Sequence, residues 1–271
     1  MGAAAEDLSA GEDEKRSALR VGGVGVYDEP RFLEAGEGCL VVEFSDGIER
    51  AANMKLQSLR RFLEGKNVRG VREYVPTFRS LSVYYDPLSI SGKKLEETIV
   101  HGLDSMKDAK APSRRVLVMP VAYGGEYGPD MKNVSEHTGF DEDEIVRRHT
   151  ANDYYCFMIG FTPGFGYLGG LDESLATPRL ASPRILIPAG SVGIADKQTG
   201  VYSIDSPGGW RLIGRTPLRL FNPDDEETPT LLEAGDWLRF RPISANEFER
   251  IASEVAAHRY VPERFHEEGG E

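Results

Sequence analysis

Arginine and glycine residues gather between positions 177 and 216, and together they could bind a small molecule that carries a carboxylate or an amide. An arginine offers parallel N–H donors that match the two oxygens of a carboxylate. Repeated glycine and proline residues fix unusual backbone angles and expose main-chain N–H groups. The segments are Thr177-Pro178-Arg179, Ser182-Pro183-Arg184, Gln198-Thr199-Gly200, Ser206-Pro207-Gly208-Gly209-Trp210 and Gly214-Arg215-Thr216.

Aromatic side chains lie in and just before this stretch and could form the apolar walls of a cleft. They are Phe165, Tyr167, Tyr202 and Trp210. The pattern therefore predicts an anion- or amide-binding cleft. A structural interpretation is equally supported, because a β-barrel needs glycine at its corners and its arginines would pair with surplus acidic residues.

Motifs for phosphate binding and nucleophilic catalysis fail on their context. Gly92-Lys93-Lys94 lacks the Ser or Thr and the earlier glycine of a P-loop. Residues 164–169 match the GxGxxG pattern, but no helix that could bind pyrophosphate follows them. Ser191 does not stand in a GxSxG turn, and we interpret it as part of a tight turn that enters a strand.

The five histidines and two cysteines show no metal-ligand spacing. We therefore expect no metal site. Most of the histidines are interpreted as structural. His149 is the exception, because it stands just before the densest motif and an imidazole titrates near neutral pH.

The chain has 271 residues and a formal net charge of −12, with 40% hydrophobic and 28% charged residues. This composition supports a buried core and disfavours nucleic acid and anionic membranes as partners. The longest apolar stretch, 116–122, is far shorter than the roughly 20 residues that span a bilayer. The first residues lack the apolar core of a signal peptide, so we expect a cytoplasmic protein.

Periodicity predicts an α+β fold with two domains. Residues 1–20 are predicted to form a solvated tail, and residues 21–110 a small domain with the order βαββα. In that domain Cys39–Phe44, Val71–Val75 and Leu81–Tyr85 are expected to be strands. The first helix is expected to end at Gly65, and residues 107–113 to link the domains.

Residues 111–262 are predicted to form a β-barrel domain. Arg115–Tyr123 and Tyr154–Phe161 are expected to be strands, and many short strands separated by Gly and Pro follow up to Pro242. Asp141 and Glu144 resemble the capping pair of a short helix that ends near His149.

Ordered motifs across this region resemble one known family. They are Phe157-Met158-Ile159-Gly160-Phe161-Thr162-Pro163-Gly164-Phe165-Gly166-Tyr167-Leu168, Pro188-Ala189-Gly190-Ser191-Val192-Gly193-Ile194-Ala195, Gln198-Thr199-Gly200-Val201-Tyr202, Ser206-Pro207-Gly208-Gly209-Trp210 and Tyr123 to Asp130. The sequence resembles the PxpB family, the B-type subunits of 5-oxoprolinase, also called KipI or allophanate hydrolase subunit 1. This family is similar to one half of a carboxyltransferase domain. The resemblance implies a cyclophilin-like barrel behind a small α+β domain.

The resemblance also implies partners and an activity. A PxpC-like subunit (KipA, allophanate hydrolase subunit 2) and a PxpA-like (LamB-type) subunit are expected to join this chain in a complex. That complex converts 5-oxoproline, ATP and water to glutamate, so ATP with Mg is expected at the level of the complex. Biotin is not expected on this chain, because Met54-Lys55-Leu56 is interpreted as part of a helix.

Site roles are assigned by chemical type. His149, Arg184 and Arg215 are the predicted catalytic residues: Arg184 or Arg215 holds the substrate carboxylate, and His149 transfers a proton. Gly208 and Gly209 could stabilise an oxyanion through main-chain N–H groups. The predicted substrate-binding residues are Phe165, Tyr167, Arg179, Gln198, Tyr202, Gly208, Gly209 and Trp210.

Two alternative functions stay open. The first is a KipI-type inhibitor that binds a sensor histidine kinase. The second is a subunit of a urea or allophanate enzyme of the carboxyltransferase type, in which biotin would lie on another chain.

Overall fold

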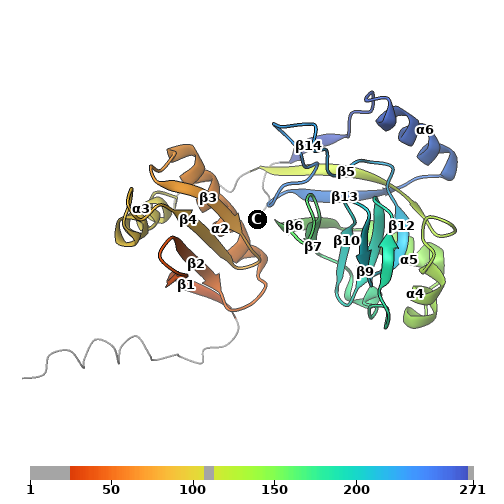
Figure 1. Cartoon of the computed structure of the whole chain (residues 1–271). Helices are drawn as coiled ribbons and strands as arrows, with labels where there is room; N and C mark the ends of the chain where they lie inside the picture. Colours follow the sequence, from red (N-terminus) through yellow and green to blue (C-terminus); the bar gives the residue numbers. More distant parts are fainter. Residues whose placement is uncertain (1–24, 107–112, 268–271) are drawn as a thin grey trace, which may run out of the picture.

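The computed structural model describes residues 25–106 and 113–267. The first of these ranges forms an antiparallel sheet of order β1-β2-β4-β3 with two helices (Figure 1). Its elements are β1 Val26–Glu34, β2 Cys39–Ser45, α2 Arg50–Lys66, β3 Val71–Pro76, β4 Ser80–Tyr85 and α3 Gly92–Ser105. The three predicted strands and two predicted helices of this domain are confirmed.

Helix α2 forms because its apolar residues recur three or four positions apart and share one face. Ala52, Leu56, Leu59 and Leu63 on that face are all fully buried in the core that α2 forms with the sheet. The helix continues one residue past the predicted end at Gly65, and Asn67 ends it in a left-handed conformation with φ of 46°. Asparagine tolerates that conformation, so it takes the place of the expected glycine.

Strand β1 is absent from the predicted order, which is therefore corrected to ββαββα. It pairs with β2 at Val26, and the register shifts before the ladder resumes at Arg31. None of its nine residues is buried. An exposed edge strand has no alternation of buried and exposed residues, so periodicity does not reveal it.

The second range forms a closed barrel of seven strands (Figure 1). The strand order is β12-β9-β10-β7-β6-β13-β5, and pairs between β12 and β5 close the ring at Gly214–Tyr123 and Arg215–Ala122. Strand β14 Arg264–Glu267 pairs with β5 outside the ring. The barrel strands are β5 Arg114–Tyr123, β6 Asp153–Ile159, β7 Gly166–Gly169, β9 Ser191–Ala195, β10 Gln198–Val201, β12 Arg211–Arg215 and β13 Trp237–Pro242. The predicted fold class is confirmed.

A two-stranded ribbon accompanies the barrel. It consists of β8 Arg184–Ile187 and β11 Ser206–Gly208, in antiparallel register. The 3-10 helix η1, Glu173–Leu175, follows β7. The ribbon matters for the site, because residues of β11 and of the segments that flank both strands line a pocket.

Three helices complete the barrel domain. They are α4 Met131–Thr138, α5 Glu142–Thr150 and α6 Ala245–Ala256. The Asp141 side chain caps α5 by accepting a hydrogen bond from the Glu144 N–H at 2.8 Å, which confirms the predicted cap. Helix α4 was not expected, because it is short and buries only Met131 and Val134.

The two parts of the chain contact each other through α2 and β6. The Tyr155 hydroxyl donates to Asn53 Oδ1 at 2.9 Å, and Gln57 Nε2 donates to the Phe157 carbonyl at 3.2 Å. Phe78 packs against Phe157 with ring centroids 5.5 Å apart. Buried polar contacts of this kind fix the orientation of the two parts.

Only some of the predicted domain boundaries lie within the described residues. The predicted tail over 1–20 and residues 107–112 of the predicted linker lie outside the described residues. Strand β14 carries the barrel sheet to Glu267, past the predicted end at residue 262. Lys55, in the sequence compared with a biotin site, lies within α2.

Candidate functional site

A pocket of about 300 Å³ lies where the barrel meets the β8–β11 ribbon. We call it the aromatic pocket. Its lining residues are Phe161, Phe165, Tyr167, Arg179, Pro183, Tyr202, Pro207, Gly208, Gly209 and Trp210. Seven of the eight residues predicted to bind substrate are among them, and Gln198 is the one that is not.

Rings packed edge to face form the wall of the aromatic pocket. Phe165 is central: its ring centroid lies 5.7 Å from that of Tyr202, 5.6 Å from Trp210 and 5.3 Å from Tyr167. Such pairs add about 0.5–1.5 kcal/mol each beyond area burial. Phe78 of the N-terminal sheet domain packs against Tyr167 at 5.6 Å. The wall is therefore held from both parts of the chain.

Glycine at position 208 is required by the space available. A Cβ atom there would collide with the Tyr202 hydroxyl, and it would lie 2.9 Å from a methyl carbon of Ile187. Only a residue without a side chain lets the β11 backbone approach the tyrosine so closely. The main chain of Gly208 and Gly209 can therefore form part of the pocket surface.

Arg179 is the one cationic side chain among the residues that line the aromatic pocket. Its Nε lies 3.3 Å from Asp196 Oδ2, and both side chains are more than half exposed. Exposed ion pairs contribute little, typically about 0–1 kcal/mol. A ligand carboxylate can therefore compete with Asp196 for the guanidinium.

The Tyr202 hydroxyl provides a neutral polar group in the same pocket. Burial raises its pKa, while the Trp210 backbone N–H and the charges of Arg179 and Arg184 oppose part of the rise. The phenol is therefore protonated at neutral pH. It accepts from the backbone and still has a proton to donate to a ligand.

Arg184, predicted to hold a carboxylate, has an internal partner. Its Nη2 donates to Asp130 Oδ1 at 2.7 Å, and the other oxygen of Asp130 accepts from the Leu212 N–H at 2.7 Å. Asp130 is buried, so this pair joins the ribbon to the barrel. The Nη1 atom of Arg184 is buried and has no hydrogen-bond partner within the described ranges.

Two other predicted residues also lie outside the lining of the aromatic pocket. Arg215 donates from Nε to the Ala189 carbonyl at 3.1 Å. Gln198 begins β10 and pairs with Ala195 of β9. Both therefore have structural contacts, and their predicted roles toward substrate stay predictions.

His149 lies inside the barrel core. It is fully buried, with Nδ1 2.9 Å from the Tyr123 hydroxyl and Nε2 2.8 Å from the Thr199 hydroxyl. Burial lowers its pKa from 6.5 to about 3, so the ring is neutral at pH 7. The predicted role of His149 in proton transfer stays a prediction. The two hydrogen bonds hold its ring in the core of the barrel domain.

Phe161 is a pocket residue that the site prediction omitted. It is 60% exposed and has a φ of 65°, which is unusual for a residue with a large side chain. It stands in Gly160-Phe161-Thr162-Pro163-Gly164, and this density of glycine and proline could have indicated a special turn. Strained residues of this kind gather at functional sites.

The rejected motifs have structural roles. Residues 164–169 turn into β7, and Ser191 begins β9 with its hydroxyl bonded to the Pro188 carbonyl at 2.7 Å. Within residues 25–106 and 113–267, no three His, Cys, Asp or Glu side chains are placed to hold a metal ion. No helix in that described part of the chain is long and apolar enough to span a membrane.

Residues 30–232 match the family described as carboxyltransferase domain, subdomain C and D. The chain is 38% identical over 231 residues to the B-type subunit of 5-oxoprolinase from Bacillus subtilis (strain 168), and the alignment covers 82% of this chain and 96% of that relative. It is 41% identical over 209 residues to the B-type subunit of 5-oxoprolinase from Escherichia coli O157:H7, with coverage of 76% and 93%.

Among solved structures, TTHA0988 has a similar fold, with a TM-score of 0.68 and 31% sequence identity. The similarity covers 76% of this chain and 40% of that chain. This chain therefore matches less than half of the TTHA0988 chain.

Proposed function

We propose, from the premise that this chain belongs to the carboxyltransferase domain family, subdomains C and D, that it is the B-type subunit of an ATP-dependent 5-oxoprolinase. Relatives that carry this name align over most of both chains. The observation that carries the proposal is the aromatic pocket, because it combines one available arginine with a tyrosine donor and apolar walls. A cyclic amide with a carboxylate requires these groups.

Arg179 holds the substrate carboxylate in this proposal. The guanidinium is the pocket's cation, and its exposed pairing with Asp196 is easily exchanged for a ligand. Arg184 supports the ribbon instead, because Asp130 occupies one side of its guanidinium. The proposed clamp is therefore moved from the two arginines expected at first to Arg179.

The lactam group then lies against the aromatic wall. The Tyr202 hydroxyl donates to the amide oxygen, and the main chain at Gly208 and Gly209 stabilises negative charge that develops on it. Opening the ring consumes one water molecule, and ATP hydrolysis consumes another. The ring opening is unfavourable alone, which is why the reaction requires ATP.

ATP with Mg is a substrate of the complex, and we assign no ATP step to residues of this chain. Partner subunits of the PxpC and PxpA type complete the enzyme, and the chain alone is inactive. Use of ATP is consistent with a cytoplasmic complex.

The PxpC-like partner covers the aromatic pocket through an apolar rim. Ile185 and Leu186 of β8 are 93% and 60% exposed, and Phe161 at the pocket is 60% exposed. Large exposed apolar side chains are typical of protein–protein interfaces. Docking there would exclude water from the reacting amide. Substituting Ile185→Asp should weaken assembly with the PxpC-like subunit, whereas Leu88→Asp, at an exposed site of the other domain, should not.

The activity is tested with this chain and its PxpC- and PxpA-like partners. We expect 5-oxoproline-dependent ATP hydrolysis with formation of glutamate in the full mixture and none with the chain alone. No activity in any mixture would refute the proposal and favour the kinase-inhibitor or urea-type alternatives.

The carboxylate clamp is tested by Arg179→Gln in the assembled complex. Loss of a charge-assisted hydrogen bond costs about 1.5–3 kcal/mol, so KM for 5-oxoproline should rise about tenfold or more. Arg72→Gln is the matched control, because Arg72 is 70% exposed in the other domain and its ion-pair distance is 3.9 Å. Equal KM values for the two variants would contradict the role of Arg179.

A further inference from the structure

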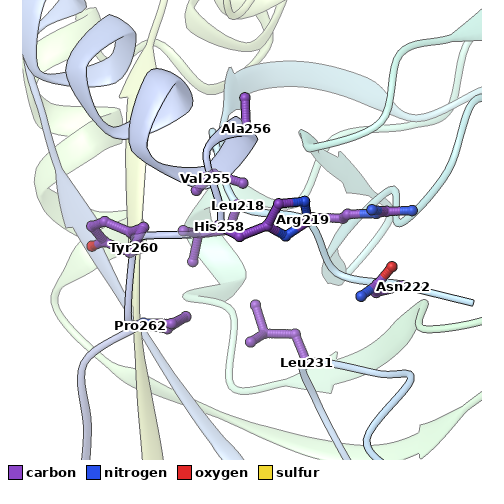
Figure 2. A pocket seen from close by; sticks show the side chains of 9 residues that line it. All are labelled: Leu218, Arg219, Asn222, Leu231, Val255, Ala256, His258, Tyr260 and Pro262. Atoms are coloured by element: carbon purple, nitrogen blue, oxygen red, sulfur yellow. The ribbon is translucent and has the colours of Figure 1, made fainter. Parts of the chain in front are cut away.

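A second cavity, of about 340 Å³, shares no lining residue with the aromatic pocket. It lies between residues 218–231, which follow β12, and residues 255–262, at the end of α6 and just beyond (Figure 2). We call it the C-terminal cavity. Nothing in the proposed function uses it.

One cation faces the C-terminal cavity without a strong internal partner. Arg219 donates from Nε to the Phe221 carbonyl at 3.1 Å. Its Nη2 lies 3.9 Å from a carboxylate oxygen of Asp224, and the Asp224 side chain is 84% exposed. A pair of that length and exposure contributes little, so the terminal nitrogens of Arg219 can bind a ligand carboxylate.

A buried acceptor in the same lining has no donor. The Oδ1 atom of Asn222 is buried and makes no hydrogen bond within the described ranges. Its backbone groups are occupied, because its N–H donates to the Pro229 carbonyl at 2.7 Å and its carbonyl accepts from the Asp225 N–H at 3.2 Å. An unmade hydrogen bond at a buried polar atom is unfavourable. Because Asn222 lines the cavity, a rotation of its side chain would bring this atom to the N–H donor of a ligand, which would satisfy it.

His258 supplies a second polar group at the C-terminal end of α6. It follows α6 with a φ of 55°, and its N–H donates to the Val255 carbonyl at 3.0 Å. In the view of Figure 2, the His258 ring and the Arg219 side chain lie below Val255 and Ala256 and above Leu231. The left-handed conformation of His258 ends the helix, as that of Asn67 ends α2.

The acidic residues that follow Asn222 in the chain favour a ligand with a single negative charge. Residues 224–227 are Asp-Asp-Glu-Glu and follow Asn222 and Pro223. Four carboxylates repel phosphates and polyanions, while one arginine is sufficient for a monoanion. Leu218, Leu231 and Val255 provide apolar surface for the rest of the ligand.

We propose that the C-terminal cavity is a second small-molecule site, which binds a monocarboxylate with an N–H donor and a compact apolar body. The carboxylate pairs with Arg219, the N–H group donates to Asn222 Oδ1, and the apolar body contacts the leucines. This inference does not depend on the function proposed for the aromatic pocket.

The His258 imidazole signal in protein labelled with ¹³C-histidine tests the site, and His258→Gln assigns that signal. The test ligand is 5-oxoproline, which has a carboxylate, an N–H group and a small ring. Cyclopentanecarboxylate lacks the N–H group and 2-pyrrolidone lacks the carboxylate. We expect a saturable shift with 5-oxoproline and affinities about tenfold weaker for the other two.

Two arginine variants locate the binding. Arg219→Gln should weaken the response of His258 to 5-oxoproline about tenfold or more, and Arg179→Gln, in the aromatic pocket, should leave it unchanged. A His258 signal that does not move with 5-oxoproline, or moves equally in the Arg219→Gln variant, overturns the inference. The function proposed for the aromatic pocket is tested separately, by KM for 5-oxoproline in the Arg179→Gln complex. A rise in that KM would support the proposed function even if the C-terminal cavity binds no ligand.

Discussion

Replacing His149 by glutamine should weaken the dependence of stability on pH between pH 7 and pH 5. The imidazole is fully buried, and burial lowers its pKa from 6.5 to about 3. In the unfolded chain the ring is exposed and has its ordinary pKa. Between these two pKa values the unfolded chain therefore binds a proton that the folded chain does not.

The sign and size follow from this difference. Stability from the neutral ring is fully present above the ordinary pKa of 6.5 and is lost as the pH falls toward 3. Each pH unit within that window changes the free energy of unfolding by about 1.4 kcal/mol. Between pH 7 and pH 5 the wild-type protein should lose about 2 kcal/mol through His149 alone.

The assay is urea unfolding of the wild-type protein and His149→Gln at pH 7, 6 and 5. Other titrating groups are common to both proteins, so their contributions cancel in the difference between the two pH profiles. The free energy of unfolding of the wild-type protein minus that of His149→Gln should rise by about 2 kcal/mol from pH 5 to pH 7. Glutamine can still offer a donor and an acceptor to Tyr123 and Thr199, which keeps the variant foldable.

Parallel pH profiles for the two proteins would refute the reasoning. An independent measurement is the His149 imidazole signal of the wild-type protein, which should stay at its neutral position at pH 5. A ring that protonates near pH 6.5 in the folded protein would instead support the predicted role of His149 in proton transfer.

Three further substitutions test the packing around the site, the propensity of helix α2 and the contact between the domains. Gly208→Ala should destabilise the protein by about 1–3 kcal/mol in thermal unfolding, because the added methyl group collides with the Tyr202 hydroxyl. Gly65→Ala, where a methyl group meets open space in α2, should stabilise it by up to about 1 kcal/mol. Tyr155→Phe should cost about 1–2 kcal/mol in urea unfolding, because Asn53 Oδ1 loses its interdomain donor.

The sequence predicted elements well where burial imposed a period. The strands expected at Cys39–Phe44 and Leu81–Tyr85 agree with β2 and β4 to within one residue at each end. Edge strands gave no such pattern: β1 has no buried residue, and β14 has alternating exposed and partly buried residues over only four positions. Both depend on pairing with a neighbour, which is a property of the folded chain.

Closure of the barrel could not be predicted from local sequence patterns, because it too depends on pairing between strands. It depends on β12 pairing with β5, about ninety positions earlier in the chain, through Gly214 and Arg215. Strand β9 is buried at all five positions, so it has no alternation to mark its faces. Short strands with glycine between them indicated a barrel or a sandwich, and long-range pairing decides which of the two forms.

The spacing of the arginines left a ligand site and a structural role equally supported, and their partners separate the two. Arg184 is bonded to a buried carboxylate 54 positions away, so its charge is already compensated in the folded chain. Arg179 and Arg219 have only long or exposed ion pairs, at 3.3 Å and 3.9 Å, and each lines a cavity. A charge can serve a ligand only if the fold has not already neutralised it. Arg179 and Arg219 are therefore the arginines for which substitution should change binding more than stability.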